Sequence, residues 1–90
     1  MELTFNKIGE SFVAEFEATS DFNLHIERAN GGRILLYQKT AGQGYDIVEG
    51  FGIQKHQGVI DMDFTALIYP KYIKVVSEVQ PIVGVVTFAE

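Results

Sequence analysis

Short runs of alternating apolar and polar residues recur along the chain and constrain its fold more than any other feature. The clearest runs are 21–28 (DFNLHIER) and 59–64 (VIDMDF). Side chains on a β-strand point alternately to opposite faces, so each run places its apolar residues on one face and its polar residues on the other. Gly, Asn, Asp or Pro separate the runs, and no helical period lies between them. The pattern predicts a small all-β domain.

The runs divide the chain into about eight strands with turn signals every 8–12 residues or so, which is typical of a sandwich or barrel. The predicted strands are 3–5, 11–18, 22–27, 34–40, 45–49, 59–64, 72–77 and 83–88. A single antiparallel β-sandwich over residues 1–90 is favoured, with a jelly roll as one arrangement. Asn30-Gly31-Gly32 suits a tight turn because Asn and Gly tolerate positive φ. Residues 78–81 are expected to close a hairpin between the last two strands.

The inward positions of these runs predict the hydrophobic core. One face of the second run and the alternate positions of the later runs supply it. The predicted core residues are Phe12, Phe16, Phe22, Leu24, Ile26, Leu36, Ile47, Ile60, Met62, Phe64, Ile73, Val75, Val86 and Phe88.

Composition and charge narrow the classes of partner. The chain has 90 residues, 47% of them hydrophobic and 12% aromatic, which suits one folded domain and argues against disorder. Twelve acids against seven Lys and Arg give a net charge of −5. Nucleic acid and anionic membranes are poor partners for such a chain, because both are bound through basic side chains.

The absence of cysteine excludes disulfides and thiolate sites. It mildly favours an intracellular or virion setting, because small secreted domains often rely on disulfides. The N-terminus lacks the basic and apolar regions of a secretory signal, and no apolar run approaches the ~20 residues that cross a bilayer. A cytoplasmic or virion-associated location is expected.

Few residues suggest chemistry. His25 and His56 stand without a recognisable catalytic motif, and surface histidines are the expected interpretation of both. Asp61 and Asp63 project from one face of one strand, as paired acids for hydrolysis or as a weak cation site would. Solvated acids on the exposed face of a sheet explain them better. No catalytic residue, cofactor or metal ligand is predicted.

The alternation breaks in two places, and these are the predicted interfaces. Residues 34–37 (ILLY) are apolar on both faces, and residues 50–58 are irregular. Large exposed apolar patches usually mark contact sites. The predicted interface residues are Leu35, Tyr37, Phe51 and Ile53.

A set of tyrosines predicts a second kind of site. Aromatic rings pack against the apolar faces of sugars, and the tyrosine hydroxyl adds a hydrogen-bonding group. The residues of this candidate glycan platform are Tyr45, Tyr69 and Tyr72.

The last two runs, 72–77 (YIKVVS) and 83–88 (VGVVTF), resemble the closing hairpin of small β-sandwich modules in phage and prophage virion proteins. Residues 34–48 similarly resemble a strand, Gly-rich tip and aromatic strand of those modules. The resemblance implies a structural or adhesive role in a tail, head or fibre, with self-association. It carries no active-site motif.

Two functions follow as expectations. The first is a non-enzymatic structural or assembly module of phage or prophage origin, acting through protein–protein contacts as a homo-oligomer or in a virion. The alternative is a carbohydrate-binding module that uses exposed tyrosines. A hydrolase using Asp61 and Asp63 is a distant third.

Overall fold

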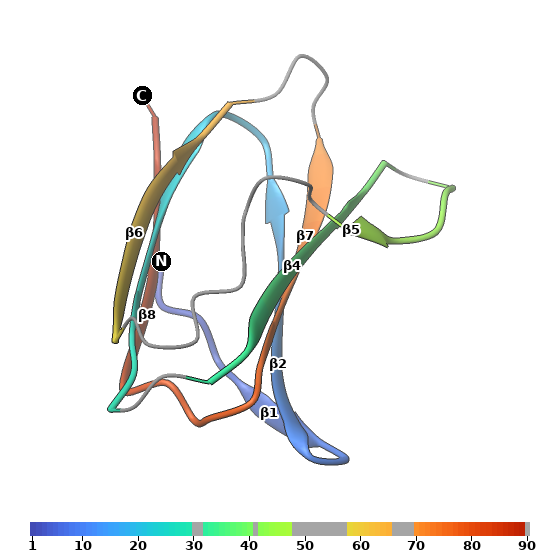
Figure 1. The fold of residues 1–90 in the computed structure, drawn as a ribbon. Coiled ribbons are helices and arrows are strands. Elements are labelled where there is room, and N and C mark those ends of the chain that lie inside the picture. The colour runs from blue at the N-terminus through green and yellow to red at the C-terminus, as the bar shows by residue number, and fades with distance from the viewer. Residues whose placement is uncertain (30–31, 41, 48–57, 66–69, 90) are drawn as a thin grey trace.

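Two antiparallel β-sheets build the fold, and they lie opposite one another in Figure 1. The computed structural model describes residues 1–29, 32–40, 42–47, 58–65 and 70–89. The five-stranded sheet has the order β1 (Asn6–Ile8), β2 (Ser11–Ala18), β7 (Lys71–Ser77), β4 (Ile34–Lys39) and β5 (Asp46–Ile47). The three-stranded sheet has the order β6 (Val59–Phe64), β3 (Phe22–Glu27) and β8 (Val83–Phe88). The predicted all-β sandwich is confirmed.

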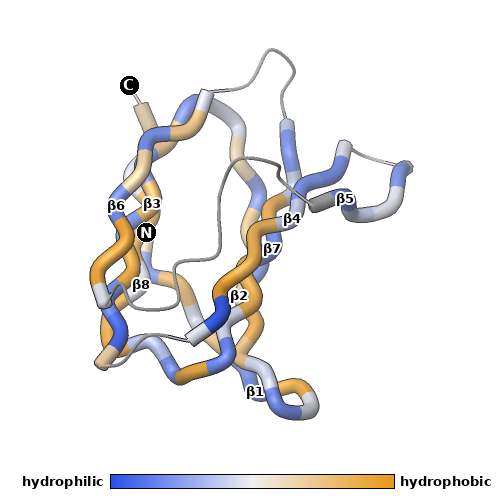
Figure 2. Tube along the Cα trace, in the orientation of Figure 1, coloured by the Kyte–Doolittle hydropathy of each residue, from blue (hydrophilic) through white to orange (hydrophobic). Residues whose placement is uncertain are grey.

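The predicted alternation sets which face of each strand is buried. In β3, the side chains of Phe22, Leu24 and Ile26 are buried and those between them are half-buried. In β7, Ile73 and Val75 are buried in the same alternating way. Figure 2 shows the resulting change between apolar and polar residues along the strands of both sheets. Each sheet therefore presents one apolar face to the other.

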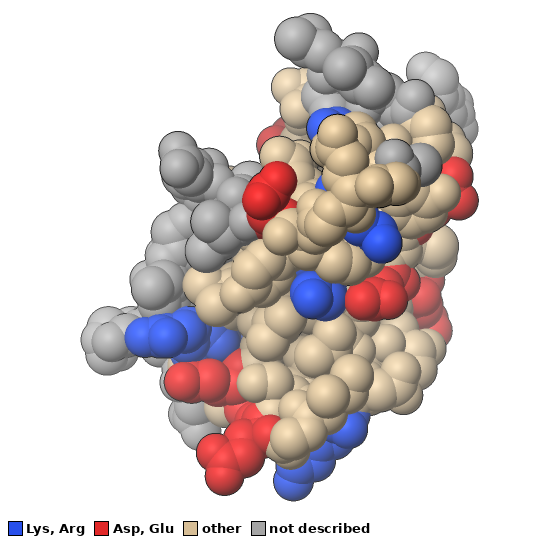
Figure 3. All heavy atoms as spheres, turned by 90° about the vertical axis from the view of Figure 1, so that its right-hand side faces the viewer, with Lys and Arg blue, Asp and Glu red and all other residues tan. Residues whose placement is uncertain are grey.

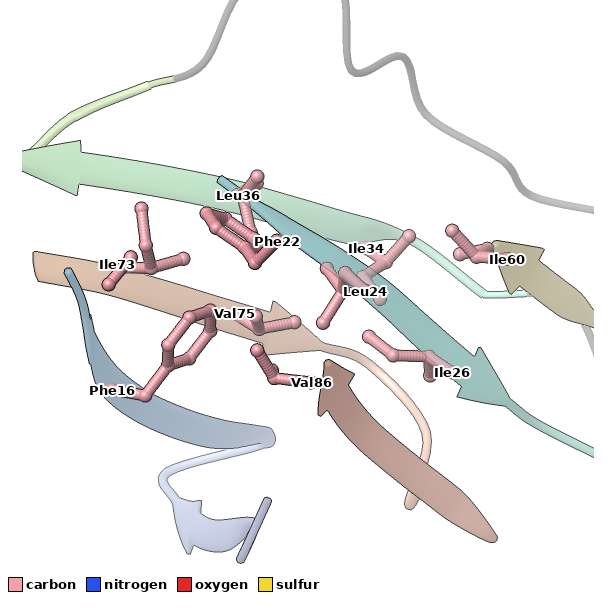
Figure 4. Packing of buried hydrophobic residues seen from close by; sticks show 11 residues of the cluster. Phe16, Phe22, Leu24, Ile26, Ile34, Leu36, Ile60, Ile73, Val75 and Val86 are labelled. Atoms are coloured by element: carbon pink, nitrogen blue, oxygen red, sulfur yellow. The ribbon is translucent and has the colours of Figure 1, made fainter. Parts of the chain in front are cut away.

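The core lies between the sheets and brings together side chains distant in sequence (Figure 4). Nine predicted core residues are buried: Phe16, Phe22, Leu24, Ile26, Leu36, Ile60, Ile73, Val75 and Val86. Met62, Phe64 and Phe88 are half-buried and pack against this cluster. Ala14, Ala18 and Ile34 are also buried. Phe12 is only half-buried near the start of β2, and the side chain of Ile47 lies outside those described.

The last two strands do not form the hairpin that the sequence suggested. β7 pairs with β2 and β4, whereas β8 pairs with β3 in the other sheet. Backbone hydrogen bonds join the two ends of the loop between these strands to different sheets. Glu78 N–H donates to the Arg33 carbonyl at 2.9 Å, and Ile82 N–H donates to the Glu27 carbonyl at 2.7 Å. Crossing between sheets lets the apolar faces of β7 and β8 bury each other.

The N-terminal segment joins both sheets, and its regular strand begins later than predicted. β1 covers Asn6–Ile8 rather than 3–5. Before it, the N–H of Leu3 donates to the Gly84 carbonyl at 2.8 Å, and the N–H of Val86 donates to the Met1 carbonyl at 2.8 Å. A Cβ on Gly84 would lie 2.8 Å from a Phe5 ring carbon, so a larger residue there would have to displace that ring. Residues 1–3 thus cover the edge of β8.

Within the described residues, no helix is long and apolar enough to span a membrane.

Candidate functional site

The outer face of the five-stranded sheet gathers most of the residues predicted to bind a partner. The register sets Val13 beside Val76 and Leu35 in one row, and Glu15 beside Lys74 and Tyr37 in the next. A third row holds Glu17, Tyr72 and Lys39. These nine residues and Tyr45 are called the Tyr–Lys face below. Their strand neighbours Ala14, Leu36 and Val75 point into the core, so the Tyr–Lys face points outward.

Lysine ammonium groups cover the tyrosine rings of this face. Lys39 Nζ lies 4.7 Å from the ring centroid of Tyr45 and 5.6 Å from that of Tyr72. Lys74 Nζ lies 4.4 Å from the centroid of Tyr45 and 5.2 Å from that of Tyr37. A cation over a ring face is attracted to the π-electrons. Burial, and to a smaller extent the charge of Glu15, raises the pKa of the Tyr45 phenol.

Next to the tyrosines lies a row of three aliphatic side chains. Val13, Val76 and Leu35 are neighbours across β2, β7 and β4, and each is half-buried. Figure 3 looks onto this side of the molecule and shows acidic and basic side chains interspersed on a mostly uncharged surface. The face is therefore apolar at one end and mixed in charge at the other.

Two separate predictions meet on this one surface. Leu35 and Tyr37 were predicted as interface residues, and Tyr45 and Tyr72 as a glycan platform. All four belong to the Tyr–Lys face, because β4 and β7 are neighbours in the sheet. The alternation in β2 and β7 could also have identified Val13, Lys74 and Val76. The other predicted residues, Phe51, Ile53 and Tyr69, lie outside the described residues.

The opposite surface, formed by the three-stranded sheet, holds a hydrogen-bonded cluster around His25. The Nδ1 of His25 lies 2.8 Å from Asp61 Oδ2, and its Nε2 lies 3.0 Å from Glu27 Oε2. The Asn23 amide donates to Asp61 at 2.7 Å and to Asp63 at 3.0 Å. The register makes these contacts, since His25 stands opposite Asp61 and Asn23 opposite Asp63. These five residues are called the His25 cluster.

Hydrogen bonding within this cluster favours the protonated ring of His25 and the ionised carboxylate of Asp61. Hydrogen bonds to Glu27 and then to Asp61 raise the pKa of His25, because both carboxylates accept from the protonated ring. Hydrogen bonds from Asn23 and then His25 lower the pKa of Asp61. When it is protonated, the His25 ring donates from both nitrogens to the two carboxylates. Over the described residues, no three His, Cys, Asp or Glu side chains group to hold a metal.

The contribution of His25 to stability should decrease as pH rises. Its pKa in the folded state is raised above the ordinary value of 6.5, so the stabilisation is fully present below pH 6.5 and is lost as pH rises through the folded-state pKa. The Asp61 contribution is present above its ordinary pKa of 3.8 and is lost at lower pH. The difference in free energy of unfolding between wild type and His25→Gln should therefore be larger at pH 5.5 or so than at about pH 8.

Urea denaturation at both pH values measures this difference, and an NMR titration of the His25 ring reports its pKa directly. In the matched variant Asp61→Asn the pKa of His25 should fall back toward 6.5, because one accepting carboxylate is lost. A pKa that does not change in this variant would contradict the assignment of the hydrogen bond.

Two hollows border these faces in the described part of the chain. One of about 410 Å³ lies between the N-terminal segment and β2, and one of about 320 Å³ lies beside Phe22, Phe64 and Phe88 at one end of the three-stranded sheet. The first adjoins the β2 residues of the Tyr–Lys face, and the second adjoins the His25 cluster. Threonines and carboxylates line both hollows.

The chain matches no protein-family model, no curated protein and no solved structure. Its two sheet surfaces and their chemistry are what bear on function.

Proposed function

We propose that the protein is a non-enzymatic assembly module whose Tyr–Lys face binds the same face of a second copy. The observation that carries this proposal is the row of Val13, Val76 and Leu35 beside half-buried tyrosines on one sheet. Aromatic and aliphatic residues that can be fully covered are what the centres of protein interfaces contain. Covering this face would remove apolar area from water, which drives association.

The distribution of charge favours this face over the other for self-association. Two copies with a net charge of −5 each repel one another. The Tyr–Lys face is balanced, since Lys39 and Lys74 offset Glu15 and Glu17. The strands of the opposite surface contribute acids and His25 but neither Lys nor Arg to their outer side. Repulsion between copies is therefore smallest when the Tyr–Lys faces meet.

The charges on the Tyr–Lys face of one copy can also pair with opposite charges on the same face of a second copy. The two glutamates lie on β2, and the two lysines lie on β7 and β4 beside it. A two-fold axis parallel to the strands and between β2 and β7 sets Glu15 of one copy over Lys74 of the other. Such an isologous contact is self-complementary, and it is the commonest form of homodimer.

A carbohydrate-binding function is the second candidate, favoured by the half-buried state of Tyr37, Tyr45 and Tyr72. Sugar stacking requires a ring face that is free to meet the sugar. Lys39 and Lys74 both approach the Tyr45 ring within 5 Å of its centroid, at 4.7 and 4.4 Å. A sugar would first have to displace these ammonium groups, so protein contact is the better-supported function.

A virion origin belongs to the same proposal. The resemblance of the strand sequences 72–77 and 83–88 to phage and prophage sandwich modules supports a place in a phage-derived particle, although β7 and β8 lie in different sheets and do not form the closing hairpin of those modules. Genes for capsid, portal or tail proteins beside the coding sequence would support this origin.

Paired valine substitutions test the self-association. Val76 lies on the Tyr–Lys face and Val85 lies on the outer side of the other sheet, and both are half-buried. Val76→Glu and Val85→Glu therefore add the same charge at comparable exposure. Sedimentation equilibrium from micromolar to millimolar concentration should show a reversible dimer for wild type and for Val85→Glu. For Val76→Glu the dimer dissociation constant should rise by about tenfold or more, because a charge is buried at the contact.

A charge exchange gives a second, independent check. Lys74→Glu should weaken the dimer, and adding Glu15→Lys should restore it, because the two residues are neighbours in the register. A glycan array with the same proteins distinguishes the second candidate. A wild type that stays monomeric throughout, or equal weakening by Val85→Glu, would refute the proposed contact.

A further inference from the structure

The edges of the two sheets differ in how far they are protected. The five-stranded sheet ends in β1, of three residues, and β5, of two residues, and beyond these short strands β2 leaves the five residues 14–18 without an outer partner in the described structure. In the three-stranded sheet, residues 1–3 cover the edge of β8. β6 has six residues, lies at the outer margin of the sheet in Figure 1, and pairs within the described chain only with β3. It is the longest unpaired edge in the described structure.

The backbone groups at this edge can be assigned to individual residues. Antiparallel pairs alternate between hydrogen-bonded and non-hydrogen-bonded. Arg28 N–H donates to the Gly58 carbonyl at 2.7 Å, so Arg28 and Gly58 form a hydrogen-bonded pair. Ile60 and Met62 continue this series toward β3. The N–H and C=O groups of Val59, Asp61 and Asp63 therefore point away from β3, toward the open edge.

At two of these three positions, Asp61 and Asp63, the side chains are acidic and held by hydrogen bonds. Asp61 and Asp63 project from the outer side of the sheet, and the Asn23 amide bridges their carboxylates at 2.7 and 3.0 Å. The Asp61 side chain is 57% exposed, so part of it still faces solvent. An added strand would place its own alternate side chains about 5 Å from these carboxylates. Basic residues at alternate positions would complement them.

A second copy of the chain is a poor occupant of this edge. In antiparallel pairing of β6 with itself about a two-fold axis near the strand centre, Asp61 would stand opposite Asp61 or Asp63 of the other copy. Like charges directly opposite across strands are destabilising. Pairing of β6 with β6 of a second copy is therefore disfavoured. A strand that carries basic side chains would instead be attracted to this edge.

We propose that β6 binds an extended cationic peptide segment by strand addition, with basic side chains at two alternate positions beside Asp61 and Asp63. The backbone of the segment pairs with Val59, Asp61 and Asp63 and supplies affinity, and its basic side chains supply register and specificity. This site lies on the sheet opposite the Tyr–Lys face and does not depend on self-association.

Capped synthetic hexapeptides provide the test. The probe is Thr-Lys-Val-Lys-Val-Thr, which puts both lysines on one side of an extended strand. A control of the same composition, Thr-Lys-Lys-Val-Val-Thr, puts them on opposite sides. A third peptide repeats the probe with both lysine backbone nitrogens methylated, which keeps the charges and removes the N–H donors that face β6. Calorimetry and amide NMR spectra are recorded with the full chain.

The probe should bind, and the amide protons of Asp61 and Asp63 should shift downfield while those of Ile60 and Met62 change less. Both control peptides should bind at least about tenfold more weakly. The double variant Asp61→Asn with Asp63→Asn should weaken binding by about tenfold, because it keeps the strand but removes two exposed ion pairs.

Three results would overturn the proposal. Binding of the methylated peptide as tight as that of the probe would show electrostatic contact without strand addition. Peptide-induced shifts could fall on the Tyr–Lys face instead of β6. Alternatively, the Asp61 and Asp63 amides could shift with protein concentration alone, which would identify a second copy as the occupant.

Discussion

Replacing Phe22 with alanine is expected to destabilise the protein by about 3–5 kcal/mol, the loss typical of a buried phenylalanine. Phe22 is 6% exposed and lies among three other rings. Its centroid is 5.3 Å from Phe16 in an edge-to-face contact and 5.1 Å from Phe64 in a stacked one. Phe88 lies 6.4 Å away. The alanine variant loses the buried ring area and these ring contacts, and leaves a cavity between the sheets.

Phe64→Ala is the matched control for this result. Phe64 is opposite Phe22 in the register, but it is half-buried on edge strand β6. Its loss of stability should be smaller, because the ring is already partly hydrated and the edge can relax. Urea denaturation followed by far-ultraviolet circular dichroism measures both losses. A Phe22→Ala loss below about 1 kcal/mol would show that Phe22 does not fill the core as described.

The second large effect is expected at Arg28, the charged residue buried most deeply among those described. Arg28 is 4% exposed, and its Nη1 donates to the Gly32 carbonyl at 2.6 Å. Burial lowers the pKa of the guanidinium, and the charge of Glu78 opposes this shift. Arg28→Ala should cost about 3 kcal/mol, because it removes a buried side chain and leaves the Gly32 carbonyl without this donor.

Arg28→Met separates the two causes of that loss. Methionine keeps much of the apolar stem but cannot donate to Gly32. The Arg28→Met variant should recover about half of the stability lost in Arg28→Ala. Thermal and urea unfolding should both rank the wild type as most stable, Arg28→Met next and Arg28→Ala last. If both variants unfold like wild type, the guanidinium contributes nothing to the fold.

The inward position of Arg28 shows where the interpretation of local sequence stopped short. Arg28 continues the alternation of Phe22, Leu24 and Ile26 by one step, but only those three were predicted as core residues. Its hydrogen bond to the Gly32 carbonyl spans only four residues, whereas the charge of Glu78 comes from the loop after β7. No local pattern indicates the contribution of Glu78.

The candidate sites also combine features that the local sequence indicates with contacts that only the tertiary structure creates. The alternation indicated that the side chains of Leu35, Tyr37 and Tyr72 point away from the core. They lie on one face together only because β4 and β7 are neighbours in the sheet. The His25 cluster likewise depends on the pairing of β3 with β6, which sets Asp61 opposite His25. Tyrosines and lysines distant in sequence meet only because the sheet orders its strands in this way.

The sequence by itself determined the strands, their inward and outward faces and most of the core, because side-chain alternation is a local property of extended backbone. The tertiary structure alone decided which strands share a sheet. Residues 78–82 could have closed a hairpin, yet they cross from β7 to β8 in the opposite sheet. That choice depends on burying two apolar faces against each other, a free energy summed over the whole core and carried by no single turn.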